Sequence, residues 1–157
     1  MLVAVWVTTL LTVPAGTNAG QFHRIDAIAM AWRLERNIAV ASGHRSCLIK
    51  SLGGDVVVLV VAPSAHGAVK WSVLVGYDNP SGSLRYLRIN KRYFTTAEEG
   101  FFGSEAEAIV TLLKGPGEFA FEWAQGPNYA KRQGLFATGD FGDRARACEA
   151  WIGETAI

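Results

Sequence analysis

Cysteine is scarce in this chain. Its 157 residues include two cysteines, Cys47 and Cys148, far apart in the sequence. A single distant pair does not match a zinc site or a cytosolic Cys-x-x-Cys motif, because both need closely spaced thiols. The pair instead predicts a disulfide bond, which would close a loop of about 100 residues and add roughly 4–5 kcal/mol of stability in the chain-entropy model.

Two other interpretations of the cysteines stay open. One is a catalytic thiol assisted by His44 or His66, and the other is a pair of unpaired buried cysteines. Cys148 falls on the apolar stripe of a predicted helix, and the thiols of exported proteins tend to be oxidised. Both observations favour the disulfide over a reactive thiol.

An excess of charge of either sign is also missing. The chain has 15 basic and 14 acidic residues, whereas a dedicated nucleic-acid binder concentrates positive charge. Half of the residues are apolar and 17 are glycine, which suits a compact β-rich domain with tight turns and excludes a disordered chain. Composition therefore predicts a globular domain that does not bind nucleic acid.

Long apolar runs are absent after the first residues. Residues 1–13 form an apolar stretch shorter than the roughly 20 residues that span a membrane. A Pro/Gly break and small residues follow, so we predict a signal peptide over 1–19, with cleavage before Gly20. No Lys or Arg precedes the apolar stretch, and the alternative is a buried N-terminal strand. Removal of the leader would leave a single domain over 20–157, periplasmic or secreted, without a stable membrane span.

Recognisable catalytic and metal-binding motifs are missing as well. The chain has no HExxH, GxSxG, Ser-x-x-Lys or glycine-rich phosphate motif. Its three histidines, His23, His44 and His66, lack the spacing of a preformed metal set. Residues 139–143 lack the acidic spacing of a calcium loop and predict a helix cap. We therefore predict no catalytic residue, no metal site and no cofactor, while an acid pair assembled in space stays open.

What is present is a run of alternating apolar residues that predicts an antiparallel meander. A Gly53-Gly54-Asp55 turn joins two of the expected strands, the second of them buried on both faces. Residues 25–32 fit a helix, whereas 31–40 could equally form a strand pair. The strands of the meander, including the two beside this turn, are expected at 47–52, 56–62, 71–77, 84–90, 118–124 and 134–138.

Two further segments have helical spacing. Ser104 and Glu107 have the spacing of a capping box, which predicts that Ser104 caps the first helix. Asp140 or Asp143 is expected to cap the second. The fold class is therefore α+β, an antiparallel β-sheet meander or sandwich packed by two helices and joined to the last helix by the disulfide. The helices are expected at about 104–114 and 143–152.

One stretch combines basic and aromatic residues and forms a possible binding patch. Such a patch could dock an envelope protein or an anionic polymer. The alternative is a solvated strand edge, where positive charge discourages edge-to-edge pairing. A second basic pair, Lys131-Arg132, follows Tyr129. The residues of the possible patch are Arg85, Tyr86, Arg88, Lys91, Arg92 and Tyr93.

Several short motifs carry a family resemblance over roughly residues 37–152. They are CLIKSL at 47–52 with its following apolar strand, WSVLVGY at 71–77, LRYLRIN at 84–90 with the aromatic-bearing turn after it, the Ser104-capped helix, FAFEW at 119–123 and a terminal F-x-x-G-D-F…A-C-E-A-W. In these motifs the chain resembles small exported bacterial proteins of the invasion-associated locus B family. The resemblance implies a periplasmic or envelope-associated β-rich domain with one disulfide and no established catalytic residues. The chain departs from the pattern in having only two cysteines and a longer segment over 21–36.

The expected function is that of an exported, non-enzymatic binding or structural domain. The first alternative is a hydrolase of an envelope polymer, whose site forms only in three dimensions. The second is an inhibitor of an extracellular enzyme, which would present a rigid loop at 78–83 or 126–133. No pattern in the sequence indicates the oligomeric state.

Overall fold

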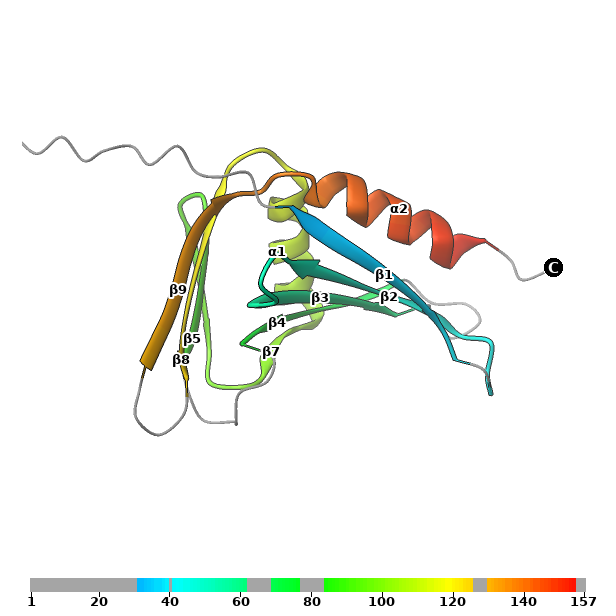
Figure 1. Cartoon of the computed structure of the whole chain (residues 1–157), viewed down its shortest axis with the longest axis horizontal. Helices are drawn as coiled ribbons and strands as arrows, with labels where there is room; N and C mark the ends of the chain where they lie inside the picture. The colour runs from blue at the N-terminus through cyan, green and yellow to red at the C-terminus, as the bar shows by residue number, and fades with distance from the viewer. Residues whose placement is uncertain (1–30, 40, 62–68, 77–83, 126–129, 155–157) are drawn as a thin grey trace, which may run out of the picture.

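The computed structural model describes residues 31–39, 41–61, 69–76, 84–125 and 130–154 (Figure 1). The predicted signal peptide and the 78–83 loop lie outside these residues, as do positions 25–30 of the segment at 25–32 that fits a helix. The described residues form two antiparallel sheets and two helices, and their buried side chains make one core. The predicted α+β class is confirmed.

The first sheet has five strands in the order β1-β2-β3-β4-β7. A glycine turn joins β2 to β3 as expected, since Gly53 and Gly54 both have positive φ angles, of 98° and 77°. Val56, Val57 and Val58 in β3 are all buried, which agrees with a strand covered on both faces. The strands are β1 (Trp32–Ile38), β2 (Arg45–Ser51), β3 (Val56–Val61), β4 (Lys70–Val75) and β7 (Gly100–Phe102).

The second sheet has four strands in the order β6-β5-β8-β9. Phe119, Phe121 and Trp123 of β8 are buried, as their alternation predicts. The last strand is longer than expected, because β9 pairs with β8 from Glu118↔Ala137 to Gln125↔Ala130. The strands are β5 (Arg85–Ile89), β6 (Arg92–Thr96), β8 (Glu118–Gln125) and β9 (Ala130–Ala137).

Both predicted helices are present, as α1 (Gly103–Lys114) and α2 (Phe141–Gly153). α1 lies where the two sheets meet, and α2 runs over β1 and β2 (Figure 1). The buried stripes of both helices join the core against the same face of the five-stranded sheet, the face that carries Cys47 and Val73. Within the described residues, neither helix is long and apolar enough to cross a membrane.

The predicted capping box of α1 is wrong, whereas Asp140 holds the N-cap position of α2 as expected. Phe102 holds the N-cap position of α1, and neither helix has a side-chain hydrogen bond at its cap. Ser104 lies inside the first turn, where its hydroxyl cannot accept from a later amide as a cap does. Asp140 does precede α2, but its carboxylate accepts hydrogen bonds from the Trp32 amide and from Arg144 Nε, both at 2.9 Å.

β1 agrees with the extended interpretation of residues 31–40, although it is one strand paired with β2 and not a pair of strands within that segment. Trp32 is the first residue of a strand and not the last of a helix, and β1 pairs with β2 along its whole length. The Trp32 indole donates to the carbonyl of Thr138 at 2.9 Å and packs edge-on against Phe141. This tertiary contact holds the start of the strand against the residues that lead into α2.

The predicted disulfide is confirmed. Cys47 in β2 and Cys148 in α2 are bonded and fully buried, with their Cα atoms 6.0 Å apart. One turn further on, the Arg45 guanidinium donates to the Trp151 carbonyl at 2.7 Å and lies 4.3 Å from the Trp151 ring centroid. A cation at the C-terminal end of a helix is favourable because the helix dipole is negative there. α2 is thus held to β2 by a covalent bond and by this arginine.

Candidate binding surface

The four-stranded sheet has one face in the core and one face in solvent. Successive side chains of a strand point to opposite faces, so Leu87 and Ile89 of β5 are buried while Tyr86 and Arg88 point outward. Tyr93 of β6 lies directly across from Arg88 and points the same way. Tyr86 is 43 % exposed and Tyr93 is 78 % exposed. Three of the six predicted patch residues therefore share the outer face.

Arg85 does not belong to the patch, and that part of the prediction is wrong. Its side chain points to the core face with Leu87 and is 1 % exposed. The guanidinium donates from Nε to the Val75 carbonyl at 2.7 Å and from Nη1 to the Glu98 carbonyl at 2.6 Å. These carbonyls belong to the end of β4 and to the chain after β6. Arg85 is therefore a structural residue that satisfies buried backbone acceptors.

Lys91 and Arg92 also lie off the outer face. Lys91 is exposed in the two-residue turn between β5 and β6. The Arg92 guanidinium lies 5.5 Å from the ring centroid of Phe94, which faces the core. The six residues lie close together in the sequence, but the strand alternation and the turn distribute them over the core, the outer face and an edge.

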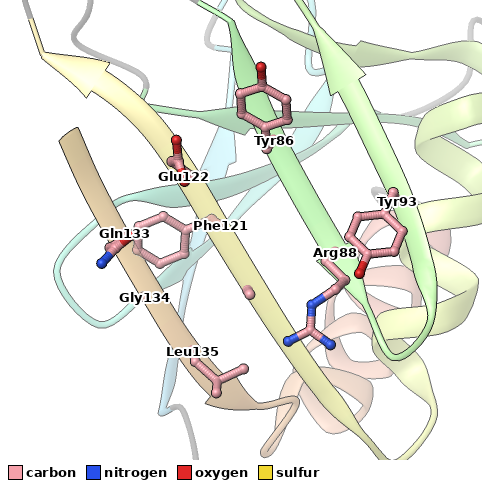
Figure 2. Close-up of a pocket in the computed structure, with 9 residues that line it drawn as sticks. Tyr86, Arg88, Tyr93, Phe121, Glu122, Gln133, Gly134 and Leu135 are labelled. Atoms are coloured by element: carbon pink, nitrogen blue, oxygen red, sulfur yellow. The ribbon is translucent and has the colours of Figure 1, made fainter. Parts of the chain in front are cut away.

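The outer face contains a hollow of about 550 Å³ that the sequence did not reveal (Figure 2). Its walls combine β5 and β6 on one side with β8 and β9 on the other. The new residues come from strands more than 30 positions further along the chain, so only the strand order brings them beside Arg88. The lining residues are Tyr86, Arg88, Tyr93, Ala120, Phe121, Glu122, Gln133, Gly134 and Leu135.

Ala120 is the small residue at the centre of this surface. It pairs with Arg88 on β5 and with Leu135 on β9, and both of these neighbours have long side chains. Gly134 pairs with Phe121 and is oriented to the core face, where a Cβ would clash with the Phe136 ring. The hollow lies over Ala120 because its short side chain stands between the longer side chains of Arg88 and Leu135. The name tyrosine face is used below for the outward residues Tyr86, Arg88, Tyr93, Ala120 and Leu135.

Of the two described cations on this outer face, one forms an ion pair and the other does not. Lys131 Nζ donates to the Glu122 carboxylate at 2.6 Å, and this hydrogen bond, together with the attraction of the two charges, raises the pKa of Lys131. Arg88 donates from Nη1 to the Asn90 carbonyl at 2.9 Å and forms no ion pair with any residue that the structure places. Arg88 thus keeps an uncompensated positive charge beside the hollow.

The second basic pair of the sequence is engaged in internal contacts. The Arg132 guanidinium contacts both carboxylate oxygens of Asp55, at 3.0 and 3.3 Å. Asp55 lies in the β2–β3 turn, so this pair joins the two sheets. With Lys131 bonded to Glu122, neither cation extends the tyrosine face, and Tyr129 lies outside the described residues.

Metal ligands do not gather within the part of the chain that the structure describes, where no group of three His, Cys, Asp or Glu side chains could hold an ion. His44 is exposed in the β1–β2 turn, and His23 and His66 are outside the described ranges. The disulfide removes both thiols from consideration as nucleophiles. The described residues at the hollow can therefore stack against aromatic or apolar groups, form hydrogen bonds and attract an anion through Arg88.

Comparison with known proteins adds no family. No protein-family model, curated protein sequence or solved structure matches this chain. The resemblance to the invasion-associated locus B family stays a prediction from the sequence.

Proposed function

We propose that this chain is an exported, non-enzymatic binding domain whose contact surface is the tyrosine face. The observation that carries the proposal is the hollow itself, which is lined by two exposed tyrosines and by an arginine without a described acidic partner (Figure 2). Sites for small ligands have volumes of roughly 300–1,000 Å³, are lined mostly by apolar and aromatic groups and carry a few polar ones.

The exposed apolar area supports the same proposal. Leu135 is 45 % exposed across the hollow from Tyr86 and Tyr93, so a large part of three bulky side chains faces water on one surface. Single exposed apolar residues are ordinary, but a contiguous group rimmed by polar residues marks an interaction site. Tyrosine is also enriched at interfaces, because it offers a rigid apolar body with a polar tip.

Export is supported by the disulfide and by the family resemblance. A buried disulfide persists in oxidising compartments such as the periplasm or the cell exterior. The charge of Arg88, with Lys91 in the adjacent turn, favours an anionic partner from the envelope.

The hydrolase alternative has less support at this surface. Retaining and inverting glycosidases generally use two carboxyl groups, one of them as an acid with a raised pKa. The described lining of the hollow contributes one carboxylate, Glu122, and it is held by Lys131. For the inhibitor alternative, residues 130–133 belong to β9 and not to a projecting loop, and 78–83 and 126–129 lie outside the described residues.

Nuclear magnetic resonance can test the proposal on the oxidised protein. The ¹⁵N-labelled chain is titrated with an envelope extract, and we expect shift changes to concentrate at Tyr86, Arg88, Tyr93 and Leu135. Ala120→Ile fills the hollow with a side chain that suits a strand, and it should reduce these changes at least tenfold. Shift changes that map to α2 or to the five-stranded sheet, and that persist in Ala120→Ile, would overturn the proposal.

A further inference from the structure

We infer that the partner of the tyrosine face is an acidic polysaccharide, with one sugar ring over Ala120 and its carboxylate on Arg88. This inference rests on the proposed binding function and gives its ligand a chemical class. Three features of the surface carry it: a ring-sized apolar floor, a polar rim and an unpaired guanidinium.

The floor and walls suit the faces of a sugar ring. A pyranose presents C–H groups on its flat faces, and these pack well against the electron-rich faces of aromatic rings. Tyr86 and Tyr93 stand out of the sheet on the β5–β6 side, and Leu135 stands opposite on β9 (Figure 2). Between them Ala120 leaves the room that a ring would occupy.

Hydrogen-bonding groups lie around this floor and not on it. Glu122 and Gln133 pair with each other across β8 and β9, next to Tyr86 on β5. Glu122 offers carboxylate acceptors, Gln133 offers an amide, and each tyrosine offers a hydroxyl. A purely apolar ligand would offer no partner to the Gln133 amide or to the tyrosine hydroxyls. The hydroxyls at the edge of a sugar ring can satisfy them.

Arg88 selects a carboxylate. A guanidinium offers parallel N–H groups that match the two oxygens of a carboxylate, and such charge-assisted pairs are among the stronger hydrogen bonds. One Arg88 nitrogen is used by the Asn90 carbonyl, and no acidic residue in the described ranges pairs with the group. A neutral sugar would gain nothing from this charge, whereas a uronic acid would neutralise it.

The open face suits a chain more than a single sugar. Tyr93 is 78 % exposed, so a lone ring would stay in contact with water on most of its surface. Weak contacts gain strength when neighbouring units of one polymer bind together, because the later contacts are intramolecular. A polysaccharide lying across β5 and β8 can add such contacts, for example with Lys91 beyond the end of β5.

Binding to defined polymers tests the inference by isothermal titration calorimetry. The oxidised protein is titrated with polygalacturonate and alginate, which carry carboxylates on sugar rings, and with dextran and poly-L-glutamate. Dextran has rings without charge, and polyglutamate has charge without rings. We expect at least one acidic polysaccharide to bind at least tenfold more tightly than either control polymer.

Matched variants test whether the polysaccharide binds at the tyrosine face. Arg88→Gln should weaken binding to the acidic polysaccharide at least tenfold, and Ala120→Ile should do the same by filling the hollow. Arg33→Gln makes the same change at an exposed arginine on β1 of the other sheet and should change affinity less than threefold. Thermal unfolding of each variant checks that its fold is intact.

The outcomes separate the inference from the proposed function. Equal binding to polyglutamate would show that charge alone, or an acidic protein, suffices and would overturn the inference. Failure to bind either acidic polysaccharide, while the envelope extract still shifts Tyr86 and Tyr93, would also overturn the inference and leave the proposed function standing. Polysaccharide binding that Ala120→Ile leaves unchanged would place the ligand on another surface and overturn the inference.

Discussion

The two sheets of this protein are secured in different ways. The five-stranded sheet is covered on one face by α1 and α2, and the Cys47–Cys148 bond ties α2 to β2. The four-stranded sheet buries aromatic side chains on its core face and leaves its other face to solvent (Figure 1). Covalent and helical support thus belongs to one sheet, and the exposed tyrosines belong to the other. A site on a strand-built surface that is braced from behind can keep its side chains in place without a ligand.

Two arginines of β5 show the same contrast within three residues. Arg85 enters the core and donates to backbone carbonyls, while Arg88 stands on the tyrosine face. They differ because successive side chains alternate between faces, and the odd separation places them on opposite sides. The same guanidinium group therefore stabilises the core at Arg85 and is available to a ligand at Arg88.

Removal of the disulfide, which joins α2 to the five-stranded sheet, should have the largest effect on the free energy of unfolding. Cys47 and Cys148 are 101 positions apart, so Cys47→Ala/Cys148→Ala frees a long loop in the unfolded chain. The chain-entropy model gives a loss of about 4 kcal/mol in the free energy of unfolding. Guanidinium chloride unfolding of the oxidised protein and the double variant measures it.

Reduction provides the control for this variant. Dithiothreitol should move the unfolding midpoint of the wild type toward that of the double variant and leave the variant unchanged. A difference of less than about 1 kcal/mol between the oxidised wild type and the variant would mean that packing, and not the covalent bond, holds α2 to β2.

The two arginines offer the next largest effect. Arg85→Met leaves the Val75 and Glu98 carbonyls without their donor in a buried site, which should lower the free energy of unfolding by about 3 kcal/mol. Arg88→Met is the matched control on the same strand, and it should change the free energy by less than about 0.5 kcal/mol. Urea unfolding of both variants gives the comparison, and similar losses at both positions would contradict the division of roles between them.

Much of the fold could be predicted because the spacing of apolar residues that identifies a strand or a helix extends over only a few neighbouring residues. The alternation of Phe119, Phe121 and Trp123 and the stripe around Cys148 each lie within a few residues, and both are confirmed. The prediction that Ser104 caps α1 failed because Ser104 matches a local pattern that the preceding strand overrides. β7 runs directly into α1, so the helix begins at Gly103 with φ of 57°, a left-handed angle that glycine adopts without strain.

The candidate site could be predicted only in part, because half of it depends on strand order. Tyr86, Arg88 and Tyr93 follow from one hairpin, but Ala120 and Leu135 come beside them through the pairing of β5 with β8 and of β8 with β9. The sequence places Arg85 in the patch because charged residues are usually exposed, but its position in β5 puts it on the core face. Alternation with the apolar Leu87 was the signal that could have excluded it.

The Glu122–Lys131 pair gives the smallest effect and sharpens the chemistry of the tyrosine face. Glu122 raises the pKa of Lys131 above its ordinary value of 10.5, so Glu122→Gln should lower that pKa, as followed by the ¹³Cε shift of Lys131 during a pH titration. Glu118→Gln makes the same change on the same face of β8 and should leave the Lys131 pKa in place.

A cation whose pKa is raised by folding stabilises the fold fully below its unfolded pKa. That stability is lost as the pH rises through the higher folded pKa, so any contribution of the pair should disappear only in strongly alkaline solution. A Lys131 pKa that does not respond to Glu122→Gln would mean that Glu122 is free of the lysine, and it would then be available as an acid to the hydrolase alternative.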